Sequence, residues 1–264
     1  MRFVSRGSNP SCMGDGMTAM KFEDQDLPDL DSDYVRLAEQ FIPGRRAIFA
    51  IVEASLLELL PQGPARILVL GAGGGEEILR LGLDNPDWAF VGVDTYEPMV
   101  ELARRRLAGT PVGSRSRVHA STIEDLDDKD FDAATCILTA HFVPDDGAKL
   151  AFFEAIRARL KPGAPLAIVD GVGVAGEPET ELLRRIWKRH AVKNGVAEDL
   201  AEKNAANFEK VAVVSVEREE ELLTSAGFER LTPIFRGLAI KGWLAFASSE
   251  AARPSPADSK MESD

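Results

Sequence analysis

The residues best suited to chemistry begin with a run of small residues, Gly71-Ala72-Gly73-Gly74-Gly75, directly after the apolar segment RILVL at 66–70. Residues without a bulky side chain let the backbone approach a ligand where a Cβ atom would clash. At a strand-to-helix turn of a parallel sheet, such a backbone commonly binds a nucleotide cofactor. The run therefore predicts a cofactor site, with a tight turn that binds nothing as the structural alternative.

Two carboxylates distinguish between cofactor classes at this turn. Dinucleotide sites favour G-x-G-x-x-G, with the pyrophosphate on the helix N-terminus, but Glu76 stands where the third glycine would be and Glu77 follows it. Two negative charges at a helix start repel a pyrophosphate and tolerate a ligand that carries a sulfonium and an ammonium group. An NAD-dependent oxidoreductase is therefore the least favoured of the enzyme classes.

Asp94 is the next candidate, because it ends a second apolar segment, AFVGV at 89–93, and stands 23 residues after Gly71. A carboxylate there can accept two hydrogen bonds from the 2′,3′-diol of a ribose. A solvated aspartate is the alternative. Together with the glycine turn, Asp94 favours a cofactor that contains a nucleoside.

His141 follows the apolar segment DAATCILTA at 132–140, at the edge where a second substrate is expected. A neutral imidazole is available near pH 7, so His141 is the candidate general base. A histidine that caps a loop or lines a pocket is the equal alternative. Phe142 and Trp187 are candidate walls of the substrate pocket, although lone aromatic residues belong more often to the core. No spacing of His, Cys, Asp and Glu is typical of a metal site, so no metal is expected.

These residues need a scaffold that brings strand ends together. Apolar segments alternate with helical patterns, which is typical of a doubly wound parallel sheet. A short turn joins the last two β segments, so the final strand should be antiparallel. We predict an α/β fold with a mostly parallel seven-stranded sheet, an antiparallel last strand and a helical lid insert. The expected strands are 66–70, 89–93, 117–120, 132–140, 165–170, 228–236 and 239–247, and the main expected helices are 45–60, 76–83, 146–160, 178–193, 197–209 and 217–226.

The polar and acidic composition of both ends predicts a disordered leader at 1–32 and a disordered tail at 248–264. Residues 33–247 are expected to form one domain, with the lid at about 178–210. Such a lid would exclude water and shape the substrate pocket.

Charge and cysteine content narrow the class of partner. A net charge of −12 and an isoelectric point of about 4.9 disfavour a nucleic acid and suit a neutral or cationic small molecule. Cys12 and Cys136 exclude a disulfide scaffold and fit a reducing cytoplasm. Because no apolar run reaches about 18 residues, no membrane span is expected, and we predict a cytoplasmic protein. A homodimer is the alternative to a monomer.

The order of several motifs resembles the class I S-adenosylmethionine-dependent methyltransferases across about residues 45–247. The motifs are VLGAGGGEE, VGVDTYEPM, HASTIEDL, FDAATCILTAHFV and RLKPGAPLAIVD. The resemblance implies S-adenosylmethionine as cofactor, with the methionine part on the glycine turn, the ribose on Asp94, and Thr95 and Met99 beside the adenosine. The further cofactor residues that it implies are Gly71, Ala72, Gly73, Gly75, Thr122, Ile123, Glu124 and Leu138.

One position departs from the family pattern. The family usually has an acidic residue two positions before the first glycine, where this chain has Val69. The ammonium group of the cofactor is then left to backbone carbonyl groups, such as those of Gly71 or Leu138, or to Glu76.

Within the family, the chain looks like the branch that contains carboxy-S-adenosylmethionine synthase and enzymes that modify the wobble uridine of transfer RNA. The resemblance implies that the synthase holds the extra carboxylate with a lid arginine, but the comparable stretch at 201–210 has none. Lys203 or Arg236 could substitute, and Arg236 is also a candidate for the substrate pocket. The basic run RRIWKRH at 184–190 is expected to be a solvated helix face rather than an RNA-binding patch.

Methyl transfer to a small molecule is the function we expect. The alternatives are synthesis of carboxy-S-adenosylmethionine, modification of a transfer RNA wobble uridine, and a non-catalytic protein that binds the cofactor, because fold alone does not fix function.

Overall fold

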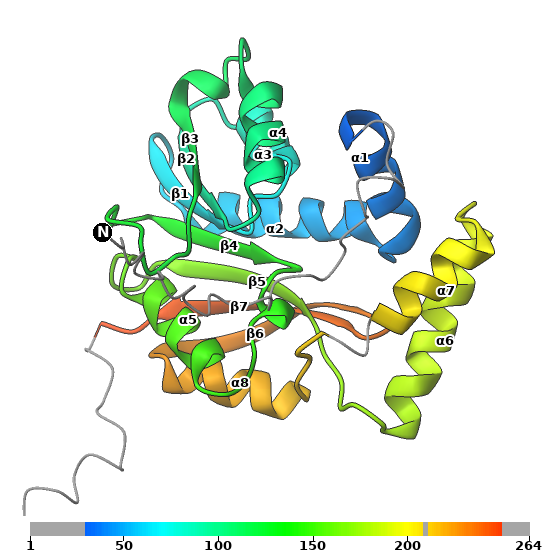
Figure 1. The fold of residues 1–264 in the computed structure, drawn as a ribbon. Coiled ribbons are helices and arrows are strands. Elements are labelled where there is room, and N and C mark those ends of the chain that lie inside the picture. Colours follow the sequence, from blue (N-terminus) through cyan, green and yellow to red (C-terminus); the bar gives the residue numbers. More distant parts are fainter. Residues whose placement is uncertain (1–29, 208–210, 250–264) are drawn as a thin grey trace, which may run out of the picture.

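The computed structural model describes residues 30–207 and 211–249 (Figure 1). Most of the leader expected at 1–32 and of the tail expected at 248–264 lies outside these residues, as do positions 208–210 within the expected lid. Among the described residues, no helix is both long enough and apolar enough to cross a membrane.

A seven-stranded sheet forms the centre of the described part, in the order β3-β2-β1-β4-β5-β7-β6. β7 is antiparallel to both of its neighbours, β5 and β6, and the other neighbouring pairs are parallel. The predicted sheet and the antiparallel last strand are therefore confirmed. The strands are β1 (Ala65–Leu70), β2 (Trp88–Asp94), β3 (Ser116–Ala120), β4 (Ala133–Ile137), β5 (Pro165–Gly171), β6 (Phe228–Gly237) and β7 (Ile240–Ala247).

Helices cover both faces of the sheet (Figure 1). One face is covered by α2, α3 and α4, and the other by α5 and α8. Their bounds are α2 (Arg45–Leu59), α3 (Glu76–Asp84), α4 (Glu97–Leu107), α5 (Ala148–Arg157) and α8 (Val216–Ser225). Helix α5 begins two residues later than the expected 146–160, because Gly147, with a φ of 106°, precedes its first residue, and it ends at Arg157.

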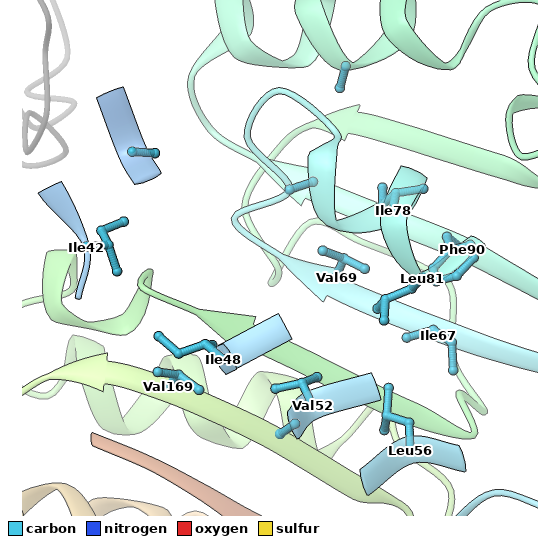
Figure 2. Packing of buried hydrophobic residues seen from close by; sticks show 14 of the residues in the cluster. Ile42, Ile48, Val52, Leu56, Ile67, Val69, Ile78, Leu81, Phe90 and Val169 are labelled. Atoms are coloured by element: carbon cyan, nitrogen blue, oxygen red, sulfur yellow. The ribbon is translucent and has the colours of Figure 1, made fainter. Parts of the chain in front are cut away.

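Burial of strand β1 on both faces explains why its sequence is apolar without alternation. Ile67 and Val69 belong to the core under α2 and α3, whereas Leu68 and Leu70 belong to the core under α5 and α8. Figure 2 shows the first of these cores, in which side chains of α2 such as Val52 pack over the strands. Burial on both faces removes the need for polar positions in the strand.

Helix α1 (Leu30–Phe41) was not predicted, because the sequence around it was interpreted as part of the acidic leader. The described fold therefore begins at Leu30, and the predicted boundary at residue 33 falls inside a helix. A helical pattern is nevertheless present: Leu37, Ala38 and Phe41 are buried on one side.

Strand β4 ends three residues earlier than the predicted limit of 140. Leu138 has a φ of 55°, a left-handed conformation that a β-strand does not continue. A 3₁₀ turn, η2 (Ala140–Phe142), follows and carries His141 beyond the carboxyl end of the strand.

The predicted insert forms two helices, α6 (Pro178–Lys193) and α7 (Glu198–Asn207), which pack against each other. Helix α6 also contacts α1, where the rings of Trp187 and Phe41 stack with their centroids 5.2 Å apart. These contacts tie the insert to the sheet-covering layer through α1 (Figure 1).

Candidate active site

A cavity of about 600 Å³ opens where the carboxyl ends of β1, β2, β4 and β5 meet. Helices α1, α2, α5, α6 and α7 contribute further walls. Ten of the eleven residues predicted for the cofactor line this cavity: Gly71, Ala72, Gly73, Asp94, Thr95, Met99, Thr122, Ile123, Glu124 and Leu138. His141, Phe142 and Trp187 line it as well.

Two predicted residues do not line the cavity. Gly75 turns its Cα toward helix α4 instead, where a Cβ would lie 3.1 Å from Ala103. Its φ of 77° and this close helix contact explain the glycine, and Gly74 lines the cavity in its place. Arg236 is exposed on β6 and lies outside the lining residues, so its predicted place in the substrate pocket is wrong.

The glycine turn is shaped by its neighbours in the fold. Gly71 has a φ of 63°, and a Cβ atom there would lie 2.2 Å from the Thr139 hydroxyl oxygen, so no other residue fits. Gly73 also has a positive φ and donates its backbone N–H to Asp94 Oδ2 at 2.8 Å. Asp94 Oδ1 accepts the backbone N–H of Tyr96 at 2.9 Å. Asp94 therefore fixes the turn and still has lone pairs for a ribose diol.

Burial raises the pKa of Asp94, and the hydrogen bonds from Tyr96 and Gly73 act in the opposite direction. These N–H donors favour the carboxylate, which is the form that accepts hydrogen bonds from a diol.

The first carboxylate of α3 is bound by the protein itself. Glu76 accepts hydrogen bonds from Nη1 of Arg45 at 2.9 Å and also from its Nη2. Arg45 contacts Glu39 as well, and its guanidinium lies 4.9 Å from the centre of the Phe49 ring. The charge of Glu76 is therefore compensated inside the protein, which argues against it as the partner of the cofactor ammonium.

Sequence reasoning missed Tyr34, which reaches the same cavity from α1. A Cβ atom at Gly73 would lie 3.6 Å from the Tyr34 hydroxyl. Burial raises the pKa of Tyr34, with Arg45 acting against this and Asp94 adding to it. The helical spacing of Tyr34 with Leu37, Ala38 and Phe41 was the signal that could have identified it.

His141 has a partner that the sequence did not reveal. Its Nδ1 lies within hydrogen-bonding distance of Oδ1 of Asp170, a fully buried residue near the end of β5. A histidine that donates its Nδ1–H to a carboxylate keeps Nε2 as its proton acceptor. The described residues thus contain a His–Asp pair in the wall of the cavity.

Further ionisable groups lie behind this pair. Lys149 on α5 and Glu219 on α8 are fully buried, with Nζ and Oε2 3.6 Å apart. Burial, together with the charge of Asp170, raises the pKa of Glu219 to about 8, although Lys149 acts to lower it.

Apolar side chains dominate the part of the cavity away from the glycine turn. The residues that line this part include Ile42, Ile48, Phe49, Val143, Phe152, Leu183, Trp187, Val211 and Leu238. Arg184 of α6 also lines the cavity, where its Nη2 pairs with Glu181 at 2.7 Å. No cluster of three His, Cys, Asp or Glu residues that could hold a metal ion occurs within 30–207 and 211–249.

Comparison with known proteins agrees with this arrangement. Residues 68–166 match the family model of a methyltransferase domain. Over 227 residues the chain is 25% identical to a carboxy-S-adenosyl-L-methionine synthase of Pseudomonas putida, which covers 81% of this chain and 91% of that protein. It is 31% identical over 125 residues to the ubiquinone/menaquinone biosynthesis C-methyltransferase UbiE of Geobacter sulfurreducens, 46% of each chain. The structure of the plantazolicin methyltransferase BpumL has a TM-score of 0.60 at 12% identity, covering 83% of this chain and 92% of the other.

The strand order and the glycine turn define a Rossmann-like α/β protein of the methyltransferase class. Residues 68–166 match the methyltransferase domain family, and the strand order and glycine turn are those of the class I S-adenosylmethionine-dependent methyltransferases, whose cofactor is S-adenosylmethionine. The cavity fits this cofactor, because it combines an acceptor for the ribose diol at Asp94 with a glycine backbone that has no side chains in the way of a ligand.

Proposed function

We propose that the protein transfers a methyl group from S-adenosylmethionine to a small, largely apolar acceptor that carries a weakly acidic O–H or C–H group. The observation that carries this proposal is the His141–Asp170 pair, whose histidine lines the same cavity as the glycine turn. A general base is needed only when the acceptor must lose a proton to become a nucleophile.

The lining of the cavity supports the nature of the acceptor. Aromatic and aliphatic side chains from α2, α5 and α6 surround the part away from the glycine turn, which favours an apolar body. Trp187 and Leu183 bring the α6 wall to this region, so the two insert helices are proposed to act as the lid over the acceptor. A closed, apolar pocket excludes water from the reacting groups.

The bound cofactor supplies an electrophilic methyl group. In the proposed reaction, His141 Nε2 takes the proton of the acceptor O–H or C–H, and the deprotonated acceptor would receive the methyl group that the cofactor, held by the glycine turn and Asp94, would supply. Asp170 holds the imidazole in the required tautomer and stabilises the imidazolium that forms. The cavity walls align the acceptor with the methyl group, which is the larger part of the catalysis.

Synthesis of carboxy-S-adenosylmethionine is the second candidate, because proteins of that name share similarity over most of this chain. A carboxylated cofactor needs a cation in the cavity. The arginines that line it are Arg45 and Arg184, and both already pair with glutamates. Lys203 and Arg236, the residues considered as substitutes, are exposed and outside the lining residues. These ion pairs favour methyl transfer.

Mass spectrometry of the ligand that copurifies with the protein, followed by turnover assays with radiolabelled methyl donor, tests the proposal. We expect S-adenosylmethionine or its homocysteine product, and methylation of phenolic or enolic compounds from a metabolite panel. Copurified carboxy-S-adenosylmethionine would support the second candidate. Methylation of transfer RNA alone, or binding without any turnover, would contradict the proposal.

A further inference from the structure

The second carboxylate of α3, that of Glu77, lies beside the glycine turn and has one oxygen, Oε1, without a hydrogen-bond partner among the described residues. Glu77 is 7% exposed and lines the cavity together with the glycine turn. Glu77 Oε1 is buried and has no hydrogen-bond partner among the described residues. A buried polar atom without a partner costs free energy, which a ligand that bonds to it can recover.

The position of Glu77 relative to the sheet is specific. The hydroxyl of Thr135, in the middle of β4, is close enough to lower the pKa of Glu77 and also lacks a hydrogen-bond partner among the described residues. Thr135 pairs in register with Val69 of β1. Paired residues of neighbouring strands point to the same face of a sheet, so the Glu77 carboxyl group lies over the strand pair that contains Val69.

We propose that Glu77 binds the ammonium group of the methionine part of S-adenosylmethionine, and so replaces from the helix the acidic residue that is absent at Val69 on the strand. The inference concerns the cofactor, and it holds whichever acceptor is methylated.

The other carboxylates that line the cavity either have hydrogen-bond partners in the protein or are exposed. Glu76 is bound by Arg45, and Asp94 accepts the backbone N–H groups of Gly73 and Tyr96. Glu124 is exposed, in the stretch expected beside the adenine. Among the carboxyl groups that line the cavity, Glu77 is therefore the one with a buried oxygen that has no hydrogen-bond partner among the described residues.

Binding of a cation by Glu77 has a measurable consequence. Burial raises the pKa of Glu77 to about 7, with Glu76 adding to this effect and Thr135 and Arg45 opposing it. Cys136, on β4 beside Thr135, also feels the charge of Glu77. Below that pH the free protein holds a proton on Glu77, and an incoming ammonium group favours its release.

Isothermal titration of the full chain tests this without any substitution. S-adenosylhomocysteine is the probe that carries the ammonium group, and 5′-methylthioadenosine is the matched probe that lacks the amino-acid part. At each pH, titrations in two buffers of different ionisation enthalpy give the number of protons released when the probe binds. We expect about one proton per S-adenosylhomocysteine at pH 6 and close to none at pH 8. Methylthioadenosine should release none at either pH. Equal proton release with both probes would overturn the proposal.

Two substitutions then locate the group. Glu77→Gln should lower the affinity for S-adenosylhomocysteine by about 10- to 100-fold and remove its proton release. Affinity for methylthioadenosine should stay within about threefold of wild type, which also shows that the variant is folded. Glu76→Gln, one residue earlier, is the matched control and should keep the proton release at pH 6. The proposal is wrong if Glu77→Gln keeps the wild-type preference for S-adenosylhomocysteine, or if only Glu76→Gln loses it.

Discussion

The imidazole of His141 and the carboxylate of Asp170 form a hydrogen-bonded pair between the 3₁₀ turn after β4 and the neighbouring strand β5. Asp170 is fully buried, and its other oxygen, Oδ2, has no hydrogen-bond partner among the described residues. A buried carboxylate favours a positive charge on the group beside it. The pair is therefore suited to accept a proton on the cavity side of His141.

Replacement of His141 by Gln should reduce turnover of a weakly acidic acceptor by about 10²- to 10⁴-fold, because an amide takes no proton near pH 7. The affinity for S-adenosylhomocysteine should not change, since the cofactor residues lie on other elements. Steady-state kinetics and titration calorimetry measure the two effects. Full turnover by His141→Gln would show that alignment alone drives the reaction.

Asp170→Asn tests the positioning role separately. The amide is similar in size but does not stabilise an imidazolium, so kcat should fall at least about tenfold while KM stays close to wild type. An unchanged kcat would limit Asp170 to a structural role.

Asp94→Ala should weaken the binding of S-adenosylhomocysteine by about 10- to 100-fold, because the hydrogen bonds of a charged group to the diol are lost. The same substitution frees the backbone N–H of Gly73. Asp94→Asn separates the two effects, since its amide oxygen still accepts one hydrogen bond. Calorimetry that gives a wild-type dissociation constant for Asp94→Ala would show that the ribose binds elsewhere.

Stability should depend on pH in a defined window. Burial raises the pKa of Glu77 to about 7 and that of Glu219 to about 8, from 4.5 in an exposed glutamate. The folded protein then holds protons that the unfolded chain has released. The contribution of these two groups to the free energy of unfolding should be greatest below about pH 4.5 and should fall as the pH rises to 8. For Glu77 alone the loss is at most about 3 kcal/mol.

Urea unfolding between pH 5 and pH 8.5 measures this loss. Glu77→Gln is the control, because an amide does not titrate and the fall between pH 5 and pH 7 should become smaller. A Glu77→Gln variant with the same slope as wild type would contradict the assigned cause.

The buried pair of Lys149 and Glu219 gives a further prediction. Lys149→Met leaves Glu219 without its cation and should destabilise the fold by about 3–5 kcal/mol above pH 8, with a smaller loss at pH 6 where Glu219 holds a proton. The double variant with Glu219→Leu should recover most of this stability, because two apolar side chains need no partner. Thermal unfolding of both variants at the two pH values tests it, and a double variant no more stable than Lys149→Met would argue against the pairing.

Local patterns in the sequence predict the sheet and the turn that lines the cavity. The apolar runs RILVL and AFVGV are readable because strands buried on both faces have no polar positions, and Gly71 and Asp94 stand at their ends. The connection between strand ends and ligand sites is general for such sheets, so local pattern was sufficient there.

The pairing of charged side chains depends on tertiary contacts that local patterns do not contain. Arg45 and Glu76 are 31 residues apart, and His141 and Asp170 are 29 apart, so no local spacing reveals either pair. The same limit hid Tyr34, whose helix follows an acidic stretch, and it placed Arg236 in a pocket that β6 does not reach. Hydrogen bonds and ion pairs depend on distances of a few ångström between elements that the chain order does not fix. The proposed role of Glu77 likewise depends on a tertiary contact, because Arg45 pairs with Glu76 and leaves Oε1 of the neighbouring Glu77 buried without a hydrogen-bond partner.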